Sequence, residues 1–183
     1  MKLSEHKILK KEILSLPPKE KDKLLLRLVA KDKVLTEHLH FLLLEDESDL
    51  ADRVFRIKSE ILSSTKKQAN AKETLTDLRK LIKLVNHNLK VTKATFEDVE
   101  LRIYLFNNMN IKFKSGMFSS YKNYEQLFAN YFVKSVLMTL KKFDKLHEDL
   151  QFDLKDELNK LLSKVYKSGM ASTADELNLP QQI

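Results

Sequence analysis

Apolar residues recur every three or four positions along most of this chain, which is the 3.6-residue period of amphipathic helices. Leucine, lysine and glutamate, which all favour helix, dominate the sequence, and β-branched residues rarely cluster. The pattern therefore predicts an all-α chain. The expected helices span residues 4–15, 18–30, 32–45, 48–68, 72–92, 95–110, 119–145 and 148–168.

Several local signals set the boundaries of these helices. The pair Pro17-Pro18 ends one helix and begins the next, because proline is tolerated only in the first turn of a helix. Ser48 is the expected N-cap of the helix that follows the acidic cluster 45–49. Thr95 and Asp98 match the Ser/Thr-x-x-acid capping pattern.

The helix breaks come about every 24 residues, so a pair of helices takes about 47 residues, close to the length of HEAT-type repeats. This spacing predicts antiparallel helix pairs stacked as a short HEAT/ARM-like α-solenoid, and a compact multi-helix bundle is the alternative. We expect one all-helical domain over residues 1–170. Asn178, Pro180 and two glutamines follow it, so residues 171–183 are expected to form a loosely ordered C-terminal tail.

The composition excludes several classes of chemistry. Two glycines in 183 residues leave almost no backbone for a phosphate-binding loop, which rules out P-loop and Rossmann sites. The chain has no cysteine, hence no disulfide, no thiolate nucleophile and no cysteine-based metal site. Neither a Gly-x-Ser-x-Gly nor a His-Glu-x-x-His motif is present. The sequence therefore predicts a non-catalytic protein without a cofactor.

The expected location is the cytoplasm. Residues 1–12 contain four lysines and two glutamates, and no apolar core of about 7–15 residues follows, as a secretory signal would require. The longest apolar runs are far shorter than the ~20 residues of a membrane span. We therefore expect no membrane insertion.

Positive charge is concentrated between residues 66 and 93, which contain eight Lys or Arg and only two acidic residues. Four of these cations fall in one narrow line along the expected helix 72–92, and we call them the basic stripe: Lys72, Arg79, Lys83 and Lys90. Such a row is able to follow a phosphate backbone, which predicts nucleic-acid binding. A solvated helix face is the other interpretation, because 28 of the 33 basic residues are Lys.

Nine of the 15 Phe and Tyr residues lie between Tyr104 and Phe132. Four of them repeat at helical spacing, and we call them the aromatic stripe: Tyr121, Tyr124, Phe128 and Tyr131. An exposed stripe of this kind favours binding of a protein or peptide partner. The alternative is that the rings belong to the core of the domain.

A carboxylate–histidine metal site is the third hypothesis. Glu37 with His40, and Asp144 with His147, each place an acid and an imidazole on one helical face, as in dinuclear helical bundles. The two further inward glutamates of such bundles are not evident, so the sequence assigns no metal ligand. The function that we expect is a non-catalytic binding or scaffold module for a protein or peptide, with nucleic-acid binding as the alternative and metal binding as a remote one.

Overall fold

A computed structural model of the chain describes residues 3–65, 69–113 and 123–183. Over these residues the structure is helical and contains no strand, which confirms the predicted all-α class. The chain divides into two compact units, Met1–Leu44 and Glu45–Ile183. The sequence analysis expected a single domain over residues 1–170, whereas the structure separates the first three α-helices, which bury no residue, from the helices that share a core.

The N-terminal unit consists of short helices. A 3₁₀ turn, η1 (Leu3–Glu5), precedes α1 (Lys7–Ser15), α2 (Pro18–Val29) and α3 (Lys33–Leu44), and α2 begins at Pro18 as predicted. No residue of α1, α2 or α3 is buried. Their exposed large apolar side chains include Ile8, Leu14, Leu25, Leu26, Leu28, Leu42, Leu43 and Leu44.

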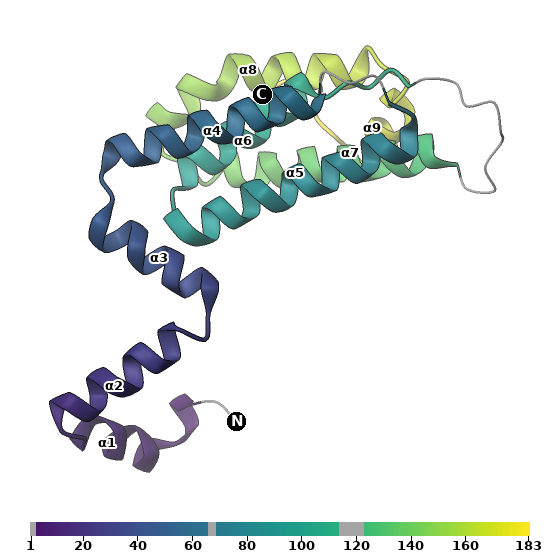
Figure 1. The fold of residues 1–183 in the computed structure, drawn as a ribbon. Helices are drawn as coiled ribbons and strands as arrows, with labels where there is room; N and C mark the ends of the chain where they lie inside the picture. The colour runs from purple at the N-terminus through teal and green to yellow at the C-terminus, as the bar shows by residue number, and fades with distance from the viewer. Residues whose placement is uncertain (1–2, 66–68, 114–122) are drawn as a thin grey trace. The chain divides into compact units, whose positions relative to one another are not determined.

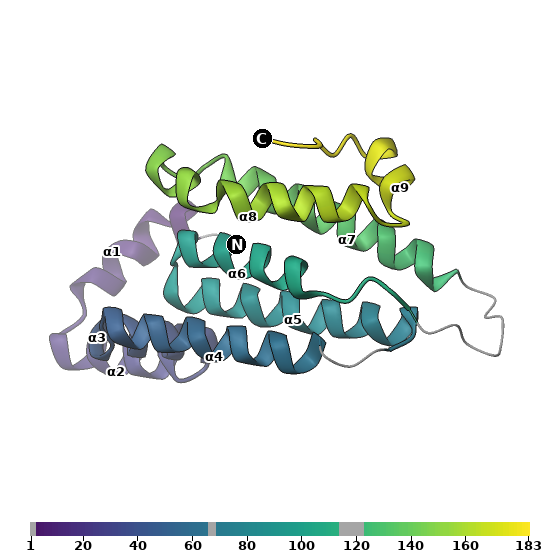
Figure 2. The same cartoon turned by 90° about the horizontal axis from the view of Figure 1, so that it is seen from above.

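The C-terminal unit is a two-layer stack of helices (Figures 1 and 2). Its elements are α4 (Glu47–Thr65), α5 (Ala71–Thr92), α6 (Thr95–Asn108), α7 (Tyr124–Phe143), α8 (Glu148–Tyr166) and α9 (Ala171–Glu176). Helices α4, α6 and α8 form one layer, and α5 and α7 form the other. Each helix mainly contacts the next one or two along the chain, as stacked helix pairs do, and the short stack is equally a multi-helix bundle. Both expected architectures therefore agree with the structure.

The core of this unit centres on α6, which contacts α4, α5, α7 and α8. Because α6 has neighbours on several sides, Val99 and Leu101 are both buried although they point to nearly opposite sides of the helix, and Phe106 is buried as well. The Phe106 ring packs edge-on against Phe132 of α7, with 5.0 Å between the centroids. Burial of each such side chain stabilises the fold by about 1.5–3 kcal/mol.

The N-termini of the helices differ from the predicted caps. Asp46, rather than Ser48, caps α4: its Oδ1 accepts from the amides of Ser48 (2.8 Å) and Asp49 (3.2 Å). The hydrogen bond from the Ser48 hydroxyl is the largest cause that lowers the pKa of Asp46 below its ordinary value, and the hydrogen bonds from the two amides lower it further. Asn70 caps α5 in a capping box with Glu73, whose carboxylate accepts from the Asn70 amide.

The expected capping pattern at α6 is also absent. The N-cap position is occupied by Ala94, and no side chain caps it. Asp98, the acidic residue of the predicted pattern, instead accepts hydrogen bonds from Arg102 and Lys142. A carboxylate surrounded by two cations binds them in preference to a backbone amide at the helix start, because hydrogen bonds between charged groups are the stronger ones.

The C-terminal segment differs from the loosely ordered tail that the sequence suggested. Helix α9 contacts both α7 and α8, and Ala174 and the following Leu179 are part of the core. The hydroxyl of Tyr166 donates to the carbonyl of Leu179, and the side chain of Asn159 accepts from the amide of Ile183 (2.9 Å). These buried side chains and hydrogen bonds hold the segment on the stack.

Candidate nucleic-acid interface

Helix α5 presents a core face and a basic face. Its buried residues include Leu75, Leu78, Ile82 and Val85. All four residues of the basic stripe are exposed. Lys72 and Lys90, at the two ends of the stripe, are 18 positions apart, or about 27 Å at the 1.5 Å rise per residue of an α-helix.

The charges of the basic stripe are not compensated within the described part of the chain. None of the four cations forms an ion pair with a carboxylate there. The two acidic residues of α5 act elsewhere: Glu73 belongs to the capping box, and Asp77 lies 3.6 Å from Lys80. Within the described residues, the stripe is therefore a line of cations without a carboxylate partner.

Three stripe residues converge on a depression of about 260 Å³ between α5 and α7, which we call the α5/α7 groove. The residues that line it are Arg79, Ile82, Lys83, Asn86, His87, Lys90 and Tyr131. None of them is acidic, so the groove offers cations and hydrogen-bond donors to a ligand. An anion is the chemical class that fits such a lining.

The basic and aromatic stripes, which the sequence analysis treated separately, meet at this groove. The guanidinium of Arg79 lies over the ring of Tyr131 at 5.2 Å from its centroid, and the Lys72 ammonium lies 5.8 Å from that of Tyr124. Both tyrosines are half-buried. These cation–π contacts hold the cations against α7 and leave their N–H groups able to donate.

The remaining residues of the aromatic stripe have other positions. Phe128 is 1% exposed and packs against Phe113 and Phe132, with centroid distances of 5.1 and 5.5 Å. Its ring is part of the core and does not reach a partner on the surface. Tyr121 lies outside the described residues.

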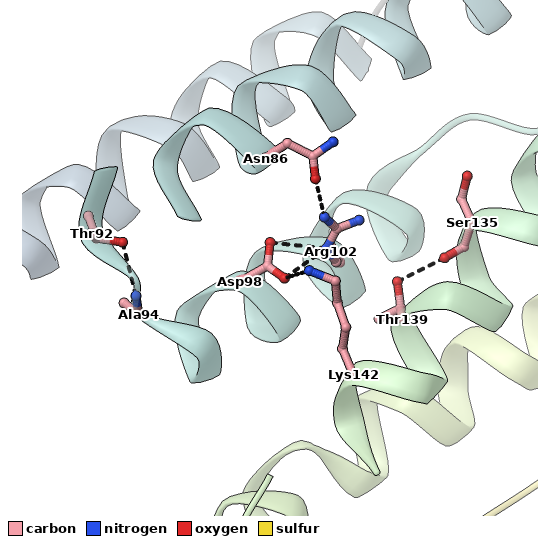
Figure 3. Close-up of polar contacts among 8 residues, drawn as sticks. All are labelled: Asn86, Thr92, Ala94, Asp98, Arg102, Ser135, Thr139 and Lys142. Atoms are coloured by element: carbon pink, nitrogen blue, oxygen red, sulfur yellow. Dashed lines mark hydrogen bonds and ion pairs between the residues drawn. The ribbon is translucent and has the colours of Figure 1, made fainter. Parts of the chain in front are cut away.

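A buried charge cluster fixes the helices that carry the groove (Figure 3). Asp98 of α6 accepts from Nε of Arg102 at 3.0 Å and from Nζ of Lys142 on α7 at 2.6 Å. Arg102 also donates through Nη2 to the side chain of Asn86, which lines the groove. Asp98 thus links α6 to α7, and Arg102 links the same cluster to α5.

Two arginines that the sequence analysis did not single out, Arg53 and Arg56 of α4, lie beside another face of α5, the one that packs toward α4. They line a second depression together with His87, which also borders the α5/α7 groove. The Arg53-x-x-Arg56 spacing, which puts both residues on one helical side, was the signal available in the sequence.

The histidines of the metal hypothesis do not form a cluster. Asp144 is the C-cap of α7 and His147 the N-cap of α8, where the imidazole accepts from the Asp149 amide at 3.4 Å. Glu37 and His40 belong to α3 in the N-terminal unit. Over residues 3–65, 69–113 and 123–183 no three His, Asp or Glu side chains are arranged to hold a metal ion.

Comparison of the chain with models of protein families, with curated proteins and with solved structures found no match. Among the described helices, none combines the length and the apolar character that crossing a bilayer requires. The argument for function therefore rests on the surface of α5 and its neighbours.

Proposed function

We propose that the protein is a non-catalytic binding module that holds the phosphate backbone of a nucleic acid along α5. The observation that carries this proposal is the convergence of Arg79, Lys83 and Lys90 on one groove without an acidic residue in its lining. Cations that contact phosphates release counterions, which makes binding favourable and strongly dependent on salt. Lys72 extends the same line of charge toward the N-terminus of α5.

The expected contacts are to the backbone of the nucleic acid rather than to its bases. Tyr124 and Tyr131 are half-buried under Lys72 and Arg79, so their faces are not offered for base stacking. Lysine supplies a point charge without the planar geometry that recognises a base edge. Binding should therefore depend little on nucleotide sequence.

The test is fluorescence anisotropy with labelled single-stranded and duplex oligonucleotides across a salt series. Four phosphate contacts give a slope of about −3.6 in log K against log salt, or about a 150-fold loss of affinity between 50 and 200 mM. The double variant Arg79→Gln/Lys83→Gln should bind more weakly, and its salt dependence should be shallower, with a slope of about −1.8 in place of about −3.6.

The matched control is Lys141→Gln/Lys155→Gln, which removes two exposed charges on α7 and α8 that do not line the groove. This control should keep the wild-type slope. Absence of binding at low salt, or an equal loss in both double variants, would show that α5 is only a solvated helix face.

A protein or peptide partner is the second candidate function, and the N-terminal unit is the observation in its favour. Helices α1, α2 and α3 bury no residue and expose many leucines, and large exposed apolar areas are typical of interaction surfaces. Without a partner, the backbone amides of these helices should exchange with solvent far faster than those of α6. Hydrogen-exchange mass spectrometry of the monomeric chain measures this, and slow exchange in α1–α3 would contradict the proposal.

A further inference from the structure

A depression of about 540 Å³ lies between α4 and α6, and we call it the α4/α6 groove. Every residue that lines it belongs to the C-terminal unit. Five of these residues are apolar: Leu50, Ala51, Val54, Phe55 and Phe96. Val54 and Phe96 are half-buried and pack against the core, whereas Phe55 is 70% exposed. Apolar side chains that gather in one depression, instead of standing singly on the surface, are typical of an interaction site.

The length of the groove suits a helix. On α4 the lining residues recur every three or four positions from Glu47 to Lys58, so they form one face of the helix. These two residues are 11 positions apart, or about 17 Å at the 1.5 Å rise per residue of an α-helix. The α4/α6 groove therefore has room along it for about three turns of a further helix, and an amphipathic helix in an apolar groove is a recurring mode of recognition.

The charge of the α4/α6 groove is negative although the chain as a whole is basic. Its one lysine, Lys58, is paired with Glu100 at 2.7 Å. Among the residues that the structure describes, neither Glu47 nor Glu97 forms an ion pair. Both lie in the first turn of their helices, where a carboxylate also stabilises the helix start. The two uncompensated carboxylates disfavour a nucleic acid or an anionic lipid surface and favour a cationic partner.

We propose that the α4/α6 groove binds an amphipathic helix of a partner protein, with apolar residues on one face and lysine or arginine beside them. The apolar face lies against Leu50, Val54 and Phe55, and the flanking cations pair with Glu47 and Glu97. A helix with acidic flanks is rejected, because it would bring like charges together. The α4/α6 groove shares no lining residue with the α5/α7 groove, so the inference does not depend on nucleic-acid binding.

The probe is a labelled 14-residue peptide of leucine and lysine whose leucines follow the spacing i, i+3, i+4 and i+7. Titration with the full-length chain, followed by fluorescence anisotropy, should give saturable binding that weakens as the salt concentration rises. The formal net charge of the chain is +7, so attraction to its overall charge does not explain binding of a cationic peptide.

Two further peptides test the helix and the charge. One has glutamate in place of lysine, and the other has the same composition as the probe with leucines at alternate positions, which removes the apolar face of the helix. Each should bind at least about tenfold more weakly than the probe. Lack of saturation with the leucine–lysine peptide, or equal affinity for either of the other two, would overturn the proposal.

Two variants locate the binding surface. Phe55→Ser removes an exposed ring, should fold normally, and should bind the leucine–lysine peptide at least about tenfold more weakly, because buried aromatic anchors dominate interfaces. Glu47→Gln/Glu97→Gln should bind about tenfold more weakly and with a smaller dependence on salt. Arg79→Gln/Lys83→Gln should bind the peptide normally, so failure of nucleic-acid binding and failure of helix binding are distinguishable.

Matched controls are present on other helices. Phe152→Ser changes a ring of α8 that is 80% exposed. Glu125→Gln/Glu148→Gln removes two carboxylates that also lie in the first turns of their helices. None of these residues lines the α4/α6 groove, so both controls should keep the wild-type affinity. Unchanged affinity in Phe55→Ser, or the same loss in a variant and in its control, would rule out this groove as the binding site.

Discussion

Replacement of Asp98 by alanine should destabilise the protein more than the loss of any other single ion-pair partner in the described residues. Asp98 is 2% exposed and accepts both from Arg102, which is 5% exposed, and from Lys142. The substitution leaves a buried guanidinium without its counter-charge. Breaking a buried pair in this way costs about 3–5 kcal/mol.

The two cations do not contribute equally to this cost. The side chain of Lys142 is 31% exposed, so its ammonium is able to turn toward water when the carboxylate is removed. The guanidinium of Arg102 is too deeply buried to turn toward water, and it keeps only its hydrogen bond to Asn86. We therefore attribute most of the loss to Arg102, and Asp98→Leu/Arg102→Met, which removes both buried charges, should recover most of the stability.

The assay is urea denaturation followed by circular dichroism at 222 nm, with the free energy of unfolding taken from the transition midpoint and slope. Glu100→Ala is the matched control on the same helix, because Glu100 pairs with Lys58 at 2.7 Å but is 30% exposed. Its loss should cost less than about 1 kcal/mol. If Asp98→Ala costs no more than Glu100→Ala, the cluster does not hold α5, α6 and α7 together.

Two further predictions concern helix ends. Asn70→Ala removes the side-chain acceptor of the α5 capping box and should cost about 0.5–2 kcal/mol in urea denaturation; Asn70→Asp, which keeps an acceptor, should not, and equal losses would contradict the capping role. Burial lowers the pKa of Lys164 from 10.5 to about 8. The unfolded chain therefore binds more protons than the folded one between pH 8 and 10.5, so the free energy of unfolding should rise with pH in this window. The measurement is the difference in free energy of unfolding between the wild type and Lys164→Met. A difference that stays constant or falls with pH would refute the buried charge.

The helices were predictable to within a few residues because the 3.6-residue period is a local property of the chain. The expected helix 72–92 agrees closely with α5 (Ala71–Thr92), and 148–168 with α8 (Glu148–Tyr166). The caps were not predictable in the same way. Asp98 matches a capping pattern in sequence, but two cations from elsewhere in the fold bind it. A cap depends on every group that competes for the side chain, and the sequence does not show these groups.

The candidate surface was predictable in part. Helical geometry alone places Lys72, Arg79, Lys83 and Lys90 in one line, and the structure has all four exposed on α5. The contact of Arg79 with Tyr131 depends on the packing of α5 against α7, which the pattern of apolar residues does not determine.

The ammonium of Lys164 donates to the carbonyls of Phe106, Asn107 and Met109 and so closes the C-terminal end of α6. Lys93, at φ 58°, ends α5 in a left-handed conformation that glycine usually provides. Several basic residues of this glycine-poor chain thus stabilise helix ends. Its formal net charge of +7 overstates the charge available for recognition, and models that treat all 33 cations as equivalent would misjudge its electrostatic field.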